Sequence, residues 1–364
     1  MKKLIALLLA LVMVLGLVAC GGGSTEETEA ATEAATEAAT EAATEAATEA
    51  ATEAAAEATT YKVGVAIYQY NDNFMTLYRQ EIETYMKSLE TDTVKYEITM
   101  VDSQNDMNTH SSQIDTFIAQ GMDVVILNLV QTSSAEVLID KLVAANIPTI
   151  LINHEPLGET DESYPGIINN PTVCYVGADA RQSGTYQGEI VLGLEDQGDI
   201  NGDGTINYVM IVGDPENPDA QYRTEYSIKA LTDAGVEVNK LVDNVGNWDQ
   251  TKGQEITAAA LAQFGDEIEV VFCNNDGMAL GAAASIEAAG RKVGEDIYLV
   301  GVDAIPEAIE LIKNGAMTGT VLNDHIGQSH AAVDAAVAAL NGEELQNYYW
   351  VDYVMVDAAY VAAN

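Results

Sequence analysis

The feature that most constrains the fold is a repeated alternation of apolar runs with amphipathic stretches over residues 61 to 364. Each apolar run is rich in Val, Ile or Leu and short enough for a strand, and the stretches between them have helical spacing. Continuous apolar strands that alternate with helices predict parallel sheets covered on both faces. The expected strands are Lys62–Tyr68, Glu97–Val101, Val124–Leu129, Thr149–Ile152, Cys174–Val176, Tyr208–Val212, Lys240–Asn244, Ile268–Cys273, Tyr298–Val302 and Gly319–Leu322.

The length of this region and its number of strands predict two lobes. A region of about 300 residues exceeds the usual size of a single core. So many strands are also too many for one compact doubly wound sheet. We therefore predict an α/β fold with two doubly wound parallel-sheet lobes.

Polar and aromatic side chains gather just after the predicted strands. In doubly wound folds the ligand lies beyond the carboxyl ends of the strands, so this is where a binding site is expected. Any one of these residues would also suit a helix cap, but capping alone does not explain so many strand ends together. The candidate binding residues are Asp72, Phe74, Asn128, Asn217, Asp219, Arg223, Trp248, Asn275, Asp303 and Asn323.

The chemistry of this set indicates a neutral polyol such as a monosaccharide. Carboxylates and amides form hydrogen bonds in the plane of a sugar's hydroxyls. Arg223 follows Asp219 by one helical turn and adds a charge-assisted donor. Phe74 and Trp248 are placed to cover the two apolar faces of a pyranose ring.

Residues 199 to 207 read Asp-Ile-Asn-Gly-Asp-Gly-Thr-Ile-Asn, a pattern typical of an oxygen-ligand loop for Ca²⁺. An EF-hand would need a Glu at loop position 12, where this chain has Met210 at the start of an apolar run. We predict a calcium loop outside an EF-hand, with its last ligand supplied from elsewhere; the alternative is a solvated Asp/Asn/Gly turn. The loop ligands would be Asp199, Asn201, Asp203, the Thr205 carbonyl and Asn207.

The first twenty residues predict export. Lys2 and Lys3 precede an apolar core over Leu4–Val18, which is short for a membrane span and typical of a signal peptide. The segment Leu-Val-Ala-Cys that closes the core resembles a bacterial lipobox, with Cys20 as the lipidated residue. The alternative is an ordinary cleavable signal with an incidental cysteine. We expect a protein anchored by this lipid to the outer face of the bacterial cell membrane.

Residues 21 to 60 repeat the unit Thr-Glu-Ala-Ala and contain almost no large apolar side chains. Such a segment cannot bury enough surface to fold alone. Alanine favours a helix, whereas Glu at every fourth position disfavours one. We interpret the segment as a disordered or partly helical stalk.

The acidic balance of the chain excludes some partners. Of the formal net charge of −42, residues 1 to 20 contribute +2 and residues 21 to 60 contribute −10, which leaves −34 for residues 61 to 364. Nucleic acids and anionic lipids favour Lys and Arg, so neither is expected as a partner. Cys174 and Cys273 lie in apolar runs and are interpreted as small buried residues, with a disulfide as the alternative.

Seven motifs, in order along residues 61 to 364, carry a resemblance to the D-galactose/D-glucose-binding proteins of bacterial ABC importers, in the type I periplasmic-binding-protein superfamily. They are Tyr-Asn-Asp-Asn-Phe-Met (70–75), Asp-Ser-Gln-Asn-Asp (102–106), the 199–207 loop, Asn-Pro-Asp-Ala-Gln-Tyr-Arg (217–223), Asn-Asn-Asp-Gly-Met-Ala (274–279), Gly-Val-Asp-Ala-Ile-Pro-Glu-Ala (301–308) and Gly-Thr-Val-Leu-Asn-Asp (319–324).

The resemblance implies two lobes that close on a sugar, joined by three crossovers. These would fall near Ile147–Thr149, Leu322–His325 and Trp350–Val354. The first lobe would then comprise residues 61–147 and 325–350, and the second residues 148–322 and 353–364.

The resemblance also assigns residues. It implies that Glu269 is the missing calcium ligand and that Phe74 and Trp248 sandwich the sugar. One position departs from the family pattern: Asn217 stands where galactose and glucose binders have a His that meets the exocyclic hydroxymethyl group. Asn is shorter and never cationic, so a changed sugar preference is expected.

The predicted function is that of a substrate-binding lipoprotein of an ABC sugar importer, with galactose or glucose as ligand and the permease as partner. Open alternatives are a pentose or related sugar, and ligand sensing through a chemoreceptor. An enzyme is not expected. Asp72, Asp219 and Asp303 resemble a glycosidase pair only loosely, since amides and Arg223 crowd them, and no Gly-rich phosphate loop follows any strand. A transcription regulator of this fold would have a basic DNA-binding segment instead of a signal peptide.

Overall fold

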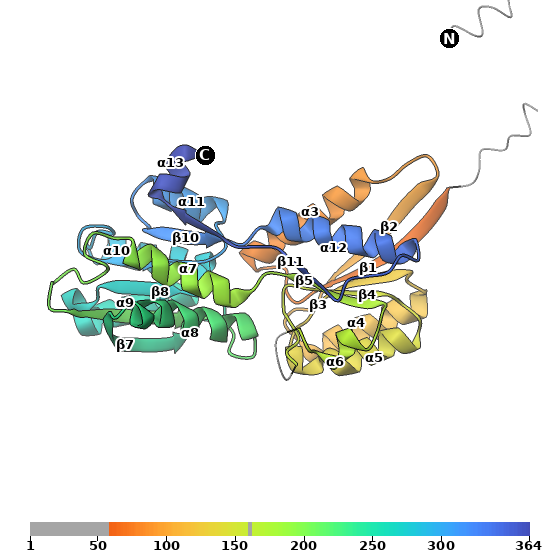
Figure 1. The fold of residues 1–364 in the computed structure, drawn as a ribbon, viewed down its shortest axis with the longest axis horizontal. Helices are drawn as coiled ribbons and strands as arrows, with labels where there is room; N and C mark the ends of the chain where they lie inside the picture. Colours follow the sequence, from red (N-terminus) through yellow and green to blue (C-terminus); the bar gives the residue numbers. More distant parts are fainter. Residues whose placement is uncertain (1–57, 159–161) are drawn as a thin grey trace, which may run out of the picture. The chain divides into compact units, whose positions relative to one another are not determined.

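The computed structural model describes residues 58–158 and 162–364, and the predicted two-lobed α/β fold is confirmed in this part of the chain (Figure 1). The signal peptide, Cys20 and nearly all of the predicted stalk lie outside the described residues. The first strand begins at Thr59 and therefore includes the last two residues of the predicted stalk, Thr59 and Thr60. None of the described helices is both long enough and apolar enough to cross a membrane.

The first lobe is built on a sheet with strand order β11-β5-β4-β3-β1-β2, in which every pair is parallel. Its strands are β1 (Thr59–Ile67), β2 (Val94–Asp102), β3 (Val124–Asn128), β4 (Thr149–Ile152), β5 (Val173–Gly177) and β11 (Tyr348–Trp350). Its helices are α3 (Asn73–Ser88), α4 (Met107–Gln120), α5 (Ala135–Ala144), α6 (Pro165–Ile168) and α12 (His325–Leu340), with a 3₁₀ turn at Thr132–Ser134.

The second lobe has strand order β12-β10-β9-β8-β6-β7 and is parallel except for β12, which runs antiparallel to β10. Its strands are β6 (Thr205–Val212), β7 (Glu237–Val245), β8 (Val270–Cys273), β9 (Tyr298–Val300), β10 (Gly319–Leu322) and β12 (Val354–Asp357). Its helices are α7 (Ala180–Leu192), α8 (Pro218–Asp233), α9 (Gln250–Phe264), α10 (Asp276–Ala288), α11 (Pro306–Lys313) and α13 (Ala358–Ala363), with a 3₁₀ turn at Gly265–Glu267.

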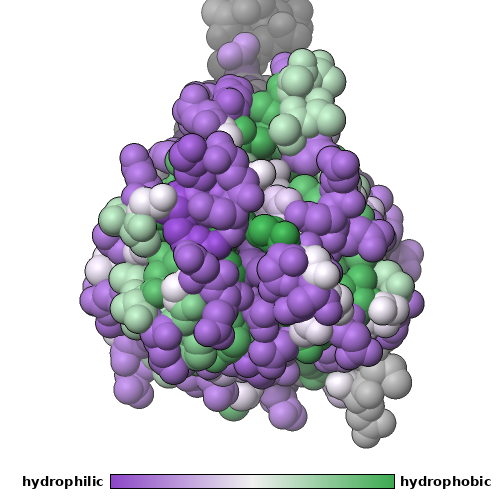
Figure 2. Space-filling model, turned by 90° about the vertical axis from the view of Figure 1, so that its left-hand side faces the viewer, coloured by the Kyte–Doolittle hydropathy of each residue, from purple (hydrophilic) through white to green (hydrophobic). Residues whose placement is uncertain are grey.

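Each sheet has an apolar core on both of its faces, as expected for doubly wound lobes. In the first lobe, α3 and α12 pack together over one face and α4 and α5 cover the other. In the second lobe, α7 and α8 cover one face and α9, α10 and α11 the other. On the face of the molecule that Figure 2 shows, hydrophilic residues cover most of the surface and apolar residues form small patches between them.

Three connections join the lobes, and the first of them corrects the predicted boundary. The predicted crossover near Ile147–Thr149 is wrong, because β4 and β5 pair in register with β3 in the first sheet. The chain therefore leaves the first lobe only after β5, just before α7 begins at Ala180. The other two connections run from Leu322 to His325 and from Trp350 to Val354.

Candidate functional site

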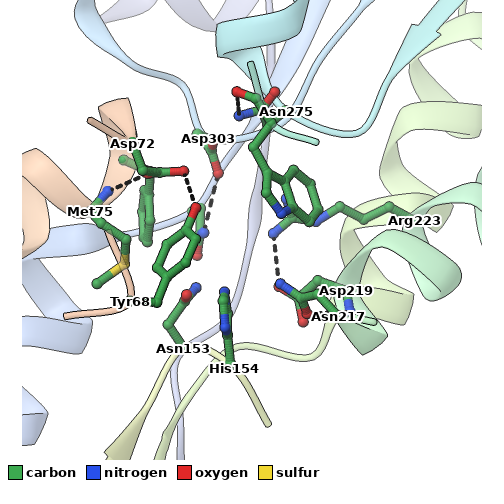
Figure 3. Close-up of a pocket in the computed structure, with 13 residues that line it drawn as sticks. Tyr68, Asp72, Met75, Asn153, His154, Asn217, Asp219, Arg223, Asn275 and Asp303 are labelled. Carbon is green, nitrogen blue, oxygen red and sulfur yellow. Dashed lines mark hydrogen bonds and ion pairs between the residues drawn. The ribbon is translucent and has the colours of Figure 1, made fainter. Parts of the chain in front are cut away.

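A buried polar cavity lies between the two lobes (Figure 3). The cavity is lined by Tyr68, Asp72, Phe74, Met75, Asn153, His154, Asn217, Asp219, Arg223, Trp248, Asn275, Asp303 and Asn323. Every candidate binding residue from the sequence is therefore in this lining except Asn128.

Asn128 is not in the cavity lining but forms hydrogen bonds with residues that are. Its Oδ1 accepts a hydrogen bond from the Tyr68 amide (3.2 Å), and its Nδ2 donates to the Ile152 carbonyl (3.1 Å) and to Asn153 Oδ1 (3.3 Å). The side chain is fully buried and ties together the ends of β1, β3 and β4. Asn153, to which Asn128 donates, is the amide that lines the cavity, and a ligand contact by Asn128 itself stays a prediction.

Four lining residues were missed by the sequence reasoning: Tyr68, Met75, Asn153 and His154. Asn153 and His154 come directly after β4, which is the position where a ligand contact is expected in a parallel sheet. They were not singled out from the sequence, although this position carried the signal. Tyr68 carried the same signal, since it follows β1.

Several candidate residues cap a helix and line the cavity at the same time. Asp72 Oδ1 accepts from the Met75 amide (2.7 Å) at the start of α3, and Asn275 Oδ1 accepts from the Met278 amide (3.0 Å) at the start of α10. Asn217 caps α8 in the same way. The cavity edge is both the carboxyl end of the strands and the amino end of the helices. Capping and ligand binding are therefore compatible here rather than alternatives.

Arg223 is held in place by three hydrogen bonds, and one of its nitrogens has no partner in the part of the chain that the structure describes. It donates to Asp219 Oδ2 (3.1 Å), the Tyr353 hydroxyl (3.0 Å) and the Asn274 carbonyl (2.8 Å). Its Nε is buried and has no partner among the described residues. A buried donor without a partner is costly, so this nitrogen is well suited to a hydrogen bond from Arg223 to a ligand.

The two aromatic residues come from opposite lobes. Phe74 is buried and packs edge-on against Tyr78, with ring centroids 5.8 Å apart. Trp248 has a positive φ of 64°, and its ring approaches Gly213 so closely that a Cβ there would lie 2.1 Å from the indole. Gly213 and the strained backbone therefore hold the indole at the cavity, as is common at ligand sites.

The cavity is rich in buried carboxylates. Burial raises the pKa of Asp72, raises that of Asp219 to about 6 against the opposing charge of Arg223, and raises that of Asp303 well above its usual range. Asp303 also has a strained φ of 125° and accepts from Asn323 Nδ2 (3.3 Å). Burial acts to lower the pKa of Arg223, but Tyr353, Asp219 and Asp303 around it together outweigh burial and raise the pKa, so the guanidinium remains charged. These groups supply both acceptors and donors for hydroxyl groups in one cavity.

The 199–207 loop wraps around its own acidic side chains. Asp199 accepts from the amides of Gly202 (2.9 Å), Asp203 (3.1 Å) and Gly204 (2.9 Å). The remote Glu269 is buried and accepts from the amides of Asn201 (3.1 Å) and Asn207 (2.8 Å). Among the described residues, no three His, Cys, Asp or Glu side chains are grouped to hold a metal by themselves. Amide and carbonyl oxygens would therefore have to complete any coordination here.

Cys174 and Cys273 are both free and buried, as interpreted from the sequence. They lie in different sheets, on β5 and β8. Burial raises the pKa of Cys174 to about 12 and that of Cys273 well above its usual range, so both stay protonated. The disulfide alternative does not apply.

Two α/β lobes, three connections and a buried polar cavity between them define a bilobal solute-binding protein. The chain belongs to the family described as periplasmic binding protein domain, whose model matches residues 63–344. The predicted family is therefore confirmed. Because this family consists of exported binding proteins, the chain is a binding protein and not an enzyme.

Individual relatives agree with this assignment. The chain is 36% identical over 280 residues to the D-galactose/methyl-galactoside binding periplasmic protein of Haemophilus influenzae, covering 75% of this chain and 79% of the relative. It is 29% identical over 305 residues to a putative rhizopine-binding protein of Rhizobium meliloti, covering 82% and 91%. Among solved structures, an ABC transporter solute binding protein of Bacillus halodurans with bound myo-inositol matches with a TM-score of 0.72 and 28% identity, covering 83% of this chain and 96% of that one.

Proposed function

We propose that this protein is the substrate-binding component of an ABC sugar importer and that it binds a monosaccharide between its lobes. The observation that carries the proposal is the cavity, whose lining combines Phe74 and Trp248 from opposite lobes with carboxylates, amides and one guanidinium. Relatives named for galactose and myo-inositol support a ring-shaped polyol.

The mechanism follows from the two-lobed lining. A sugar that forms hydrogen bonds with both Asp72 of the first lobe and Asp219 of the second binds the closed state more tightly than the open one. Its differential affinity shifts the population toward closure. The closed form would then be recognised by the membrane permease, and a chemoreceptor that recognises the same form is an additional partner to test.

Galactose or glucose is our first choice of ligand, with a preference altered by Asn217. Its Oδ1 already accepts from the Asp219 amide (3.0 Å), whereas its Nδ2 is free to donate to a ligand. This amide donor carries no charge, unlike a protonated His. A pentose that lacks the exocyclic arm is therefore the main competing ligand.

A thermal-shift panel of galactose, glucose, xylose, ribose and arabinose tests the function. A ligand that binds only the native state raises the melting temperature in proportion to its affinity and concentration. We expect a shift with one or two of these sugars at millimolar concentration. Sucrose, which is too large for the cavity, is the control for nonspecific stabilisation by sugars. If no monosaccharide shifts the melting temperature beyond sucrose, the transport proposal fails.

We propose in addition that the 199–207 loop and Glu269 bind Ca²⁺ as a structural ion. The ligands would be Asp199, Asn201, Asp203, the Thr205 carbonyl, Asn207 and Glu269. The burial of the Glu269 carboxylate against the amides of this loop supports the proposal. Bound there, the ion would compensate the charge of three carboxylates and connect the loop to the edge of β8.

We also propose that the mature protein is tethered by a lipid on Cys20, which holds the binding lobes near the permease at the outer face of the cell membrane. The lipobox-like segment before Cys20 supports this proposal. Metabolic labelling with a palmitate analogue tests it: Cys20→Ser should abolish the label, whereas Cys174→Ser should leave it unchanged.

A further inference from the structure

We propose that His154 determines the specificity of the sugar site by accepting a hydrogen bond from the ligand at its ring Nε2. The proposal rests on the function proposed above and assigns a ligand contact to one residue of the cavity lining. His154 follows β4 and was not among the residues that the sequence singled out.

The side chain of His154 is placed rigidly in the cavity. Asn153, with a positive φ of 60°, turns the chain at the end of β4, and His154 then lines the cavity with only 5% of its surface exposed (Figure 3). Its ring packs against Tyr68, with centroids 4.7 Å apart. Tyr68 is itself fixed by a hydrogen bond from its hydroxyl to Asp72 Oδ2 (2.7 Å).

The tautomer of His154 follows from its partner. Its Nδ1 lies 2.5 Å from the Leu129 carbonyl oxygen. A carbonyl only accepts hydrogen bonds, so Nδ1 must carry the hydrogen and donate. Burial and the nearby charge of Arg223 lower the pKa of His154 to about 4, so the ring is neutral at physiological pH. Nε2 is then a lone-pair acceptor and cannot donate.

No hydrogen bond among the described residues uses Nε2 of His154. The side chain lines the cavity, so a bound ligand is the available partner for this nitrogen. A ligand hydroxyl can donate to it, whereas a carbonyl or ether oxygen at the same place cannot. A ligand without that hydroxyl leaves a buried acceptor unsatisfied, which costs on the order of tenfold in affinity.

Binding of monodeoxy analogues tests the proposal. The parent is galactose, or whichever sugar of the panel above binds most tightly, and each analogue lacks one hydroxyl. Several analogues should bind more weakly than the parent, and we expect the one that lacks the hydroxyl facing His154 to bind the unmodified protein about tenfold more weakly. In His154→Leu this difference should shrink to about twofold or less, because the acceptor is gone. His154→Gln, whose amide oxygen can accept, should restore much of it.

His330→Gln is the matched control, because this histidine lies on α12 against Tyr85 and away from the cavity. It should leave the affinity of every analogue unchanged. If all analogues keep the same ratio to the parent in His154→Leu as in the unmodified protein, His154 accepts no hydrogen bond from the ligand and the proposal is wrong. A protein that binds no sugar at all overturns the proposed function itself, a result distinct from unchanged ratios.

A spectroscopic measurement on the unmodified protein decides the matter if His154→Leu does not fold. In ¹⁵N-labelled protein, the ring nitrogens of His154 should show a protonated Nδ1 and an unprotonated Nε2 near neutral pH. Saturating sugar should shift the Nε2 resonance in the direction of a hydrogen-bonded acceptor. A protonated Nε2, or an Nε2 resonance that saturating sugar leaves in place, contradicts the proposal.

Discussion

Individual side chains at the cavity owe their positions to small local features. The indole of Trp248 reaches the site because residue 213 has no Cβ, and Asp303 does so through a strained backbone. Strain of this kind persists where the surrounding structure or the function requires it, which is consistent with a ligand site at this cavity.

Trp248→Ala should weaken sugar binding at least about tenfold, equivalent to about 1.4 kcal/mol, since it removes a large apolar surface from the cavity. Isothermal titration calorimetry measures the change. Trp350→Phe is the matched control, because Trp350 stacks on Tyr348 outside the cavity lining and Phe keeps an aromatic ring there. An unchanged affinity in Trp248→Ala would remove the aromatic sandwich from the mechanism.

The buried His110 should make the folded protein less stable in acid. It is fully buried on α4, and burial lowers its pKa from 6.5 to about 4. The unfolded chain therefore binds a proton between these values that the native state does not. Stability from this group is complete above pH 6.5 and is lost as the pH falls toward 4.

The shifted pKa of His110 therefore lowers the free energy of unfolding by about 2 kcal/mol near pH 5, relative to its value above pH 6.5. His110→Leu should therefore lose about that much less stability than the unmodified protein when the pH is lowered from 7 to 5, as measured by urea denaturation. The raised pKa values of Asp219 and Asp276 have the opposite effect, but they are common to both proteins and cancel in the comparison. Equal losses in the two proteins would show that His110 titrates normally in the native state.

At the scale of elements, the loop before β6 links two parts of the second lobe. Glu269 immediately precedes β8, and its carboxylate binds amides of the 199–207 loop. Without a cation, the carboxylates of Asp199, Asp203 and Glu269 repel one another, so the loop should then weaken the lobe.

Chelation of Ca²⁺ should therefore lower the melting temperature by several degrees while sugar still binds at low temperature. Glu269→Gln should lower it similarly and make it insensitive to chelator. The neighbouring exposed Glu267→Gln is the control and should behave like the unmodified protein. Loss of sugar binding before loss of the fold would mean that the ion regulates binding rather than stabilising the lobe.

At the scale of the molecule, the cavity lining is almost inaccessible: Asp72, Asp219 and Asp303 each have less than a tenth of their surface exposed. A ligand can enter only if the lobes separate. The three connections between the lobes are the places where the backbone must change, in the manner of hinge closure.

Sugar should accordingly reduce the radius of gyration measured by small-angle X-ray scattering in solution, because it shifts the population from open to closed. Trp248→Ala at the same sugar concentration is the control and should stay mainly open. A radius that does not change at saturating sugar would contradict closure on the ligand and indicate a cavity that is formed in advance.

The sequence by itself determined the two α/β lobes, most strands to within a few residues, and all of the cavity-lining residues from the second lobe and its hinge. These follow from local rules: apolar runs make strands, and in parallel sheets the strand ends meet at one edge. The short strands β11 and β12 escaped prediction, because each has only three or four residues and is ordered by its neighbours in the sheets.

Only the tertiary structure decided which lobe receives β4 and β5, and with them Asn153 and His154. Strand pairing joins residues far apart in the chain, so no local pattern distinguishes a strand that stays in its lobe from one that follows a crossover. For the same reason the sequence could not tell Asn128 and Asn153 apart, since both are amides at strand ends. In the structure, the side chain of Asn128 is occupied by hydrogen bonds to Tyr68 and Ile152, whereas Asn153 lines the cavity.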